Sequence, residues 1–496
     1  MKFTLNCTLV LSKDPKIGVD DILKGVSEIL EKGAPKGEGA KIESRELKGN
    51  ELILKITSGK YTRPHDVVFR IKNFLAKELG KKYHLGVKSI FADTYTIDFQ
   101  VDSEPVKEIK IPFATLEFKG RECRLILKNL DEDFLQKNYV DRMINLVIDK
   151  VIKQQFGAKS EHHEIVYVGK EREPKYDKDP SIELLNRHWI KRTSHRNQFI
   201  FGAQITELAE ALKRAIVDNI YEPLGFVEMI FPKIESFDIW KKSGHLYSIY
   251  QGGFNPYLFI TPKSASPEEW EEIADFIKIT NEIPKEKFMS MLDFPTGGLS
   301  FAQCPAFWPY LESATIAEES LPIKVFDWSG PTYRYESGGA HGFERVDELH
   351  RIETLWVGSK EQVIEITDLV RKKFRYLFED VLELKMREAW VTPWFMAQQG
   401  LVELDREKTT GTVDFEAILP YKKEWLEVQN CSNNGNKYPK AFNVKSQKKE
   451  LFSGCAGGSF ERYLSAFLAQ KGFNQDDWSK SFRKYIKEIP KGVKFL

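Results

Sequence analysis

The chain has 496 residues, of which 42% are hydrophobic and 30% are charged, and its formal net charge is +1. The length exceeds that of one ordinary domain and predicts two or three, while the near-zero charge excludes recognition of nucleic acid by overall basicity. A local basic surface is still compatible with these totals, because residues 1–150 carry 27 Lys and Arg against 23 Asp and Glu.

The N-terminal segment MKFTLNCTLVLSKD is typical of a β-strand, and its short apolar run with no cleavage site argues against a signal peptide. No stretch of the sequence approaches the roughly 18 apolar residues that span a bilayer. The five cysteines lie far apart without paired spacing, which argues against a disulfide framework. We therefore expect a cytoplasmic protein whose cysteines are buried apolar side chains or metal ligands.

The first part of the chain is predicted to be an α+β domain. β-Forming residues that alternate or run apolar predict strands over 3–12, 51–58 and 89–101. Apolar residues at helical spacing predict helices over 18–33, 65–79 and 131–156. Strands in one sheet with helices on one face make a complete layered architecture, so we expect an N-terminal domain over residues 1–165.

A charged, proline-punctuated segment, GKEREPKYDKDPS, predicts a linker over residues 166–190. A second domain is expected over 191–496, and a helix is predicted within it at 206–224. In the same domain, Ser266 followed by Glu269 predicts a helix start with a serine N-cap.

Three segments of the second domain carry charged or glycine-rich motifs. The first, GFVEMIFP at 225–232, joins the long helix to a strand that ends in proline, and alone it is an ordinary helix–strand junction. The second, RYESGGAHGFERVDELHRIE, places two β-type stretches on either side of a glycine-rich loop. Arg334 and Glu336 are two apart on a strand and so face the same side. Alone, this segment fits a salt-bridged surface hairpin equally well.

The third segment, SGCAGGSFER, is predicted to be a glycine-rich turn that opens a helix, with Arg462 in the first turn. Glycines allow a ligand to approach the backbone closely, and a helix N-terminus favours anions. The order and spacing of the three segments are more specific than any one of them.

Together the three segments resemble motifs 1, 2 and 3 of class II aminoacyl-tRNA synthetases. The segments AQCPAFWPY, RYESGGAHGFERVDELHRIE and EVQNCSNNGNKYPKAFNVKSQ are also similar to the zinc-dependent (type 2) seryl-tRNA synthetases of methanogenic archaea, and the resemblance runs from about residue 185 to 475. It implies a class II catalytic domain, an antiparallel sheet flanked by helices, preceded by an α+β tRNA-binding domain. The implied enzyme is a serine–tRNA ligase, which activates serine with ATP to seryl-adenylate and transfers serine to tRNA(Ser).

The resemblance assigns residues to ATP, which would bind with Mg²⁺. It places Arg334 at the α-phosphate, Glu336 at the adenine amino group and Arg462 near the γ-phosphate. Guanidinium groups there would neutralise charge on the phosphoryl oxygens, and Glu427 is the implied Mg²⁺ ligand. The implied ATP-binding set is Arg334, Tyr335, Glu336, Arg345, Val346, Leu349, Glu427 and Arg462. Leu349 departs from the family pattern, because an aromatic residue that stacks on adenine is usual at this position.

Family likeness further implies one Zn²⁺ per subunit, bound by Cys304, Glu353 and Cys455. No local motif indicates this site, since the three residues lie 49 and 102 positions apart and each cysteine alone fits a buried thiol. Three protein ligands would leave one tetrahedral position open for the amino group of serine. The implied serine-binding set is Ala302, Arg334, Arg351, Trp394, Gln398, Asn430 and Ser432. Such polar groups are required to reject glycine and alanine.

Several other residues are expected to be structural or to contact partners. His162 and His163 fit a solvated loop, His341 fits either a flexible loop tip or a contact with the tRNA end, and Cys431 is expected to face away from the site. The N-terminal basic residues that either bind the tRNA backbone or are simply solvated are Lys60, Arg63, Lys72, Lys77, Lys81 and Lys82. The first motif implies a homodimer through residues 206–232.

Two other functions stay open at this stage. An amino acid:carrier-protein ligase, a relative with a similar zinc site, would lack the large N-terminal domain that this sequence has. A catalytically silent synthetase paralogue that acts as an RNA-binding module would usually lack a motif arginine or a metal ligand, and here these residues are all present.

Overall fold

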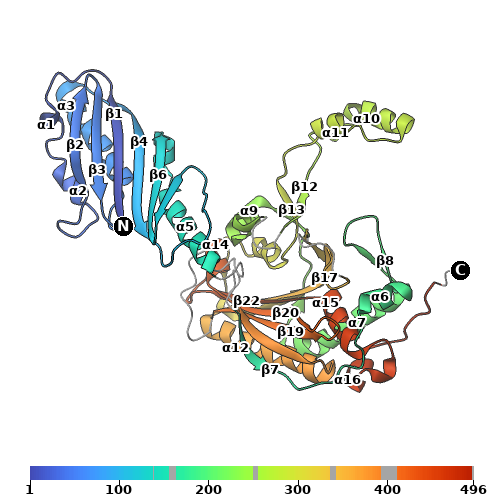
Figure 1. Cartoon of the computed structure of the whole chain (residues 1–496). Helices are drawn as coiled ribbons and strands as arrows, with labels where there is room; N and C mark the ends of the chain where they lie inside the picture. The colour runs from blue at the N-terminus through green and yellow to red at the C-terminus, as the bar shows by residue number, and fades with distance from the viewer. Residues whose placement is uncertain (138, 156–162, 250–254, 336–341, 392–409, 494–496) are drawn as a thin grey trace. The chain divides into compact units, whose positions relative to one another are not determined.

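The computed structural model describes residues 1–137, 139–155, 163–249, 255–335, 342–391 and 410–493 (Figure 1). The chain divides into two compact units, Met1–Ser160 and Glu161–Leu496. Among the described residues, no helix combines the length and the apolar character that crossing a membrane requires.

The first unit is built on one antiparallel sheet of six strands in the order β2-β3-β1-β4-β6-β5. Its strands are β1 (Lys2–Leu11), β2 (Lys41–Lys48), β3 (Glu51–Ser58), β4 (Val87–Gln100), β5 (Thr115–Lys119) and β6 (Glu122–Leu130). Alternate side chains of β1 are buried, so one face of the sheet carries the core. The predicted strands β1, β3 and β4 are confirmed, whereas β2, β5 and β6 were not predicted because charged side chains on their open face mask the apolar pattern.

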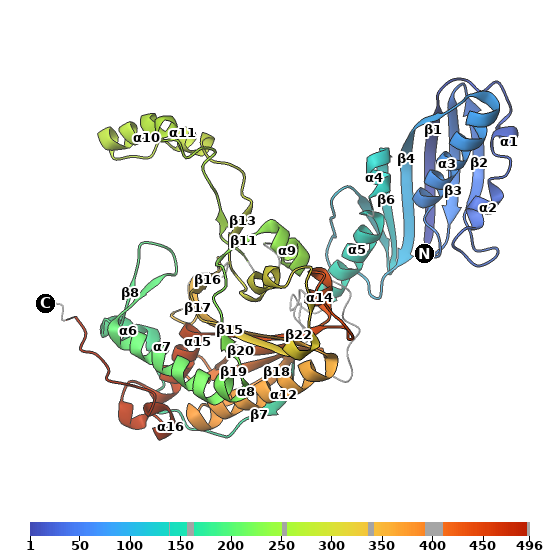
Figure 2. The same ribbon diagram turned by 180° about the vertical axis from the view of Figure 1, so that it is seen from behind.

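The helices of the first unit are α1 (Val19–Ile22), α2 (Ser27–Glu31), α3 (Pro64–Tyr83), α4 (Glu132–Gln136) and α5 (Tyr139–Gln155). Figure 2 shows α3 lying against the sheet, and α3 buries Val67, Ile71, Leu75 and Leu79 at helical spacing. The single helix predicted over 18–33 is two short helices. Gly25, with a φ of 91°, lies between them in the left-handed region and ends the first.

The second unit has a sheet in the order β10-β15-β17-β22-β20-β19-β18-β7, with β16 paired to β17 (Figure 1). Its strands are β7 (His163–Val168), β10 (Val227–Glu228), β15 (Ile323–Asp327), β16 (Pro331–Tyr333), β17 (Glu348–Gly358), β18 (Met386–Val391), β19 (Gly411–Leu419), β20 (Glu424–Gly435) and β22 (Phe452–Ser459). All neighbours are antiparallel except β10 and β15. Helices α7 (Ala203–Ile216), α12 (Lys360–Tyr376) and α15 (Phe460–Lys471) share one apolar core with this sheet. The predicted α+β fold with an antiparallel catalytic sheet is confirmed.

Shorter elements connect and cover this sheet. Those before β15 are α6 (Pro180–Asn186), β8 (Ile190–Arg192), β9 (Phe199–Phe201), η1 (Val217–Tyr221), α8 (Glu222–Leu224), β11 (Ile234–Ser236), α9 (Phe237–Ser243), η2 (His245–Ser248), β12 (Leu258–Phe259), α10 (Pro267–Thr280), α11 (Lys285–Ser290), β13 (Gly297–Leu299), η3 (Cys304–Tyr310), β14 (Thr315–Ile316) and η4 (Glu318–Ser320). Those after β17 are η5 (Leu377–Val381), α14 (Lys437–Ala441), β21 (Lys445–Ser446), η6 (Gln475–Asp477) and α16 (Lys480–Arg483). Ser266 is the N-cap residue of α10 as predicted, but its hydroxyl bonds Glu268 and makes no capping bond to the helix backbone.

The domain boundaries differ from the predicted ones. The expected linker 166–190 contains the end of β7, all of α6 and the start of β8. Strand β7 pairs with β18 at the edge of the catalytic sheet, so residues 163–165 belong to the second unit. His163, expected in a solvated loop, lies on β7 and its Nε2 is 2.9 Å from Glu416 Oε1, while His162 lies outside the described residues. Strand β7 was not predicted because its apolar run is short and a charged segment follows it directly.

The third motif also differs from its prediction, because its glycine-rich segment is the central strand β22 and not a turn. Helix α15 starts only at Phe460, with Ser459 as its N-cap. The glycines leave room for side chains that cross the strand: a Cβ on Gly454 would overlap the ring of Trp356. Strand β22 therefore needs glycine for packing within the sheet.

Candidate active site

Successive side chains of strand β17 point to opposite faces of the sheet, and the two faces have different surroundings. Ile352 and Trp356 point into the core under α7, α12 and α15. Arg351, Glu353 and Leu355 have the opposite parity, and Leu355 belongs to a second apolar cluster that also holds Cys304 and Cys455. The face of the sheet away from the helices is therefore where the predicted site residues gather.

The three central strands bring these residues into register. Glu353 on β17 lies opposite Gly457 on β22, which in turn lies opposite Asn430 on β20. In the next row, Cys455 lies opposite Ser432. Gly457 is required at its position, because a Cβ there would overlap both Arg351 Nη2 and Glu353 Oε2.

Cys304, Glu353 and Cys455 form a buried cluster whose ligand atoms all lie within 4.8 Å of one another. Tetrahedral zinc with Zn–S bonds of about 2.3 Å needs ligand atoms about 3.8 Å apart, so the donor set fits zinc in type and in spacing. Arg351 Nε donates to Glu353 Oε2 at 2.8 Å, which leaves the other carboxylate oxygen available to a metal. A hydrogen bond with Cys455 and burial raise the pKa of the Cys304 thiol well above its usual value, as expected where a cation is needed to hold the thiolate form.

Glu427 on β20 is paired with one guanidinium group and is influenced by the charges of two others. Arg462 Nη1 donates to the carbonyl oxygen of Glu427 at 3.1 Å and to its Oε2 at 3.2 Å. Burial opposes ionisation of Glu427, but the charges of Arg462, Arg334 and Arg351 outweigh it and lower the pKa of the carboxyl. The surplus of positive charge beside one carboxylate suits the triphosphate of a nucleotide with its divalent cation.

The base of the second motif is fixed by hydrogen bonds. Arg334 Nε donates to the carbonyl oxygen of Phe301 at 3.1 Å, and its backbone NH donates to the carbonyl oxygen of Asp347 at 2.7 Å. Arg196 lies over the ring of Tyr335 at 3.7 Å and its Nε donates to Asp347 Oδ2 at 3.1 Å. Sequence reasoning missed Arg196, because it is 139 positions before Tyr335 in the chain and carries no motif of its own.

The remaining predicted residues fall into three groups. Ala302 precedes Cys304 on the same segment, and the side chains of Asn430 and Ser432 bond Gly457 NH at 3.1 Å and Thr412 Oγ1 at 2.8 Å. Leu349, Val346 and Arg345 belong to the second motif, where Leu349 and Val346 are buried and Arg345 is exposed. The predicted residues that lie outside the described ranges are Glu336, His341, Trp394 and Gln398.

Cys431 faces away from the site as predicted, with its Sγ 3.8 Å from the carbonyl oxygen of Thr367 on α12. Sequence reasoning also missed Asn434 and Tyr438, which touch the two cysteine sulfurs. Both lie in the segment SNNGNKYP, and the run of asparagines in a buried strand was the available signal.

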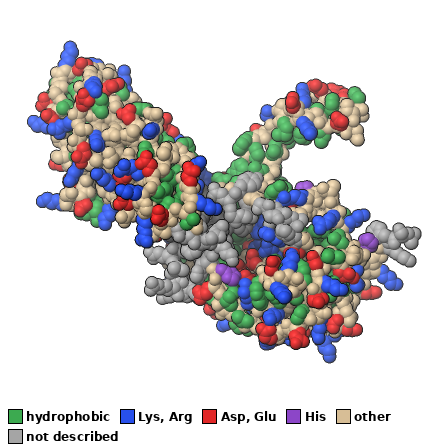
Figure 3. Space-filling view, in the orientation of Figure 1, with side chains coloured by type: hydrophobic (Ala, Val, Ile, Leu, Met, Phe, Trp, Pro, Cys, Tyr) green, Lys and Arg blue, Asp and Glu red, His purple; other side chains and the backbone are tan. Residues whose placement is uncertain are grey.

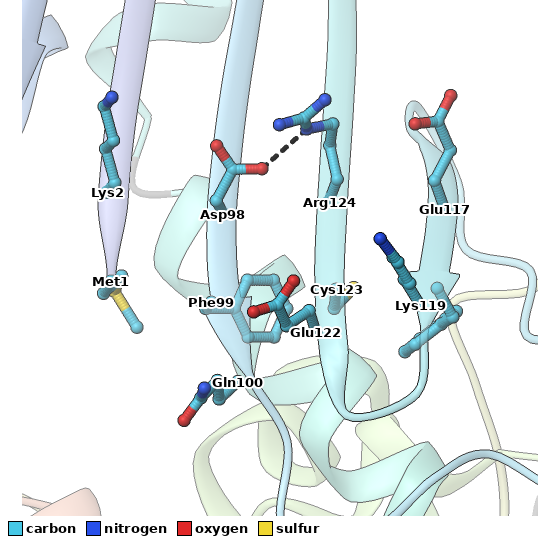
Figure 4. Close-up of a pocket in the computed structure, with 11 residues that line it drawn as sticks. Met1, Lys2, Asp98, Phe99, Gln100, Glu117, Lys119, Glu122, Cys123 and Arg124 are labelled. Atoms are coloured by element: carbon cyan, nitrogen blue, oxygen red, sulfur yellow. Dashed lines mark hydrogen bonds and ion pairs between the residues drawn. The ribbon is translucent and has the colours of Figure 1, made fainter.

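The described residues of the first unit offer a polar surface and include no group of three or more metal-binding side chains. Figure 3 shows Lys and Arg side chains interspersed with acidic ones on its visible face. A shallow concavity at the ends of β1, β4, β5 and β6 has both signs of charge, including the pair Arg124 Nε–Asp98 Oδ1 at 2.6 Å (Figure 4). Of the basic residues singled out in the sequence, Arg63 pairs with Asp141 and Lys72 with Glu132. These two therefore have a structural partner within the unit.

The antiparallel sheet, the helix–strand motif, the paired strands β16 and β17, the strand–helix motif and the arginines beside them define a class II aminoacyl-tRNA synthetase. The family models agree: residues 1–149 match a tRNA-binding domain, and residues 299–471 match the tRNA synthetase class II core domain (G, H, P, S and T).

Curated relatives identify the family more closely. The chain is 42% identical to the type-2 serine–tRNA ligase of Methanococcoides burtonii and 43% identical to that of Methanothrix thermoacetophila, with both chains covered in full. A crystal structure of M. kandleri SerRS in complex with A. aeolicus tRNASec superposes with a TM-score of 0.82 at 28% identity, covering 100% of this chain and 99% of that one. The chain belongs to the type-2 serine–tRNA ligase family, and its activity is the ligation of serine to tRNA.

Proposed function

We propose that the cluster on the open face of β17, β22 and β20 forms seryl-adenylate with one zinc ion per subunit and passes serine to tRNA(Ser). The observation that carries this proposal is the convergence of Cys304, Glu353 and Cys455 within 4.8 Å, in a buried site next to the paired Arg351. Protein synthesis would place the activity in the cytoplasm.

Cys304, Glu353 and Cys455 would hold the zinc ion. Bound there, zinc would supply a Lewis acid with one open tetrahedral position for the neutral amino group of serine. Two thiolates and one carboxylate leave the occupied site at about −1, and Arg351, bonded to Glu353, offsets that charge. Asn430 and Ser432 on β20 offer polar side chains to the substrate, with Ala302 as a small wall. Trp394 and Gln398 stay predictions for the serine hydroxyl.

For ATP, the guanidinium groups of Arg334 and Arg462 would bind the phosphates, and Glu427 would hold Mg²⁺. A carboxylate oxygen of serine attacks the α-phosphorus, and the bond to pyrophosphate breaks. Attacking group and phosphate are both anions, so neutralisation and alignment by fixed arginines lower the barrier. Leu349 lies on the same face of β17 as Arg351 and would give adenine an apolar contact without a π-system.

Amino-acid-dependent ATP–pyrophosphate exchange tests this proposal. The full chain is assayed with each of the twenty amino acids, before and after chelation and after zinc is restored. We expect exchange with serine alone, loss of exchange on chelation and recovery with zinc, because the amino group would lose its binding site. Exchange with glycine or alanine would indicate a carrier-protein ligase, and no exchange would indicate a silent paralogue. Serine exchange that survives complete metal removal would overturn the zinc assignment.

We also propose that the chain is a homodimer through its first motif. Val227 and Ile230 lie in this motif and Ile234 follows it, with 60%, 80% and 55% of their surface exposed. Three exposed apolar side chains within eight residues are unusual on a free surface and are typical of an interface.

Replacing Val227 and Ile230 together with aspartate should convert the dimer to monomer, because two charges would be buried without partners. Sedimentation velocity measures the change. Ile182→Asp on α6 is the matched control, since Ile182 is also 60% exposed and lies outside the motif. A monomeric unmodified chain, or a double variant that stays dimeric, would contradict the proposed interface.

A further inference from the structure

Among the described residues, each sulfur of the proposed metal cluster has a hydrogen-bonding neighbour besides the other ligands. Asn434 Nδ2 lies 3.3 Å from Cys455 Sγ, and Tyr438 OH lies 3.8 Å from Cys304 Sγ. Asn434 and Tyr438 are 3% and 1% exposed, so both contacts are shielded from solvent. Neither residue belongs to the serine, ATP or metal sets discussed above.

Asn434 reaches the sulfur through an irregularity in the sheet. Asn433 lies opposite Gly454 and Gly435 lies opposite Ser453, so Asn434 is an extra residue without a partner in the ladder between β20 and β22. Such β-bulges redirect a side chain and are frequent beside active sites. Gly435 has a φ of 60° and donates its NH to Asn433 Oδ1 at 3.0 Å, which stabilises the irregular backbone.

The side-chain amide of Asn434 is oriented with its NH₂ group toward the sulfur of Cys455. Its Oδ1 has no hydrogen-bond partner among the described residues, and a buried acceptor in that state is unfavourable. The contact through Nδ2 is the polar interaction that the side chain makes. A thiolate accepts hydrogen bonds, so an amide NH₂ directed at it is favourable when the sulfur is ionised.

Tyr438 is held in place by aromatic packing. Its ring is stacked on Trp308, with centroids 5.4 Å apart and planes at 19°. Trp308 lies in η3, the helix that begins at Cys304. The hydroxyl of Tyr438 is therefore fixed relative to the Cys304 sulfur by packing within one small cluster.

We propose that Asn434 and Tyr438 are positioning residues that donate hydrogen bonds to the thiolates of Cys455 and Cys304 when zinc is bound. Arg351 donates in the same way to Glu353, so each of the three proposed zinc ligands then accepts a hydrogen bond from a neighbouring side chain. Such donors orient the ligands and disperse negative charge from the sulfurs, which strengthens the complex and leaves the metal more electrophilic toward an amine. This inference rests on the zinc site proposed above.

The test compares the full-length chain with Asn434→Asp and Tyr438→Phe. Asn434→Asp preserves shape but replaces a donor with an acceptor, and Tyr438→Phe removes only the hydroxyl. We expect zinc affinity, measured by competition with a chelator, to fall about 10- to 100-fold in each. With Co²⁺ in place of zinc, the sulfur-to-metal charge-transfer absorption should move to longer wavelength in Tyr438→Phe, because an unbonded thiolate gives up charge more readily.

Tyr95→Phe is the matched control, since Tyr95 is a buried tyrosine of the first unit whose hydroxyl bonds His65 at 2.9 Å. It should leave zinc affinity and the cobalt spectrum unchanged. Variants that bind zinc as tightly as the unmodified chain, with an unshifted cobalt band, would overturn the inference while the zinc site stands. An unmodified chain that binds no zinc would remove the zinc site itself and this inference with it. If Asn434→Asp does not fold, Tyr438→Phe decides.

Discussion

Arg334→Ala should lower serine-dependent ATP–pyrophosphate exchange by about 10²- to 10³-fold, the usual effect of removing one group that stabilises developing charge. The guanidinium of Arg334 is held by the carbonyl oxygen of Phe301 and contributes to the positive field around Glu427. Because we propose that Arg334 acts on the phosphates in the transition state, the loss should appear mainly in kcat. Pyrophosphate exchange at saturating serine and ATP measures it.

Two further variants make this result specific. Arg334→Lys keeps the charge but not the planar fork, so it should recover only part of the activity. Arg483→Ala on α16 removes a surface arginine whose contact with Asp476 is 3.5 Å long, and it should leave exchange unchanged. Full activity in Arg334→Ala would show that this arginine does not contact the reacting phosphate.

The second large effect is expected from Gly457→Ala. A methyl group at Gly457 would overlap Arg351 Nη2 and Glu353 Oε2, so a proposed zinc ligand and its partner must move. Displacement of reacting groups by about 1 Å costs about 10²-fold in rate, and we expect serine exchange to fall at least that far. Zinc content of the purified chain should fall in parallel, measured by atomic emission on the folded fraction.

Gly454→Ala is the control for folding. Gly454 and Gly457 face opposite sides of β22, and a methyl group on Gly454 would meet the ring of Trp356 in the core. We expect a lower melting temperature from this overpacking, with zinc content of the folded protein close to normal. If Gly457→Ala retained zinc and activity, Arg351 and Glu353 would have to be placed differently from the arrangement described here.

Much of this architecture follows from sequence patterns. Period-two alternation predicted β1, β3 and β4, and helical spacing predicted α3 and the helix that begins with α7, because each buries one face against a core. Strands β5 and β6 escaped prediction since their outward side chains are charged. The glycine-rich β22 is predicted as a turn from sequence, because the side chains that require its glycines, Trp356 and Arg351, come from the neighbouring strand β17.

The site could be predicted only in part for a similar reason. Arg334 and Arg462 stand in recognisable motifs, whereas Cys304, Glu353 and Cys455 are far apart in the chain and were assigned through family resemblance. Their convergence depends on strand order, with β22 between β17 and β20, which no local pattern encodes. Contacts such as Arg196 on Tyr335 or Asn434 on Cys455 depend on a loop and a bulge, whose geometry is set by the folded neighbours.

The two faces of β17 have a consequence for anyone who would redirect this enzyme to a new amino acid. On one face of the strand Arg351 and Glu353 lie at the proposed site, while the side chains of the other face fill the largest core of the unit. A mutant library that randomises the whole strand would therefore mix altered specificity with lost solubility. Screens of such a library would recover variants selected for folding more often than variants with a changed substrate. A library confined to Leu349, Arg351 and Glu353, built on a background stabilised elsewhere, would separate the two selections.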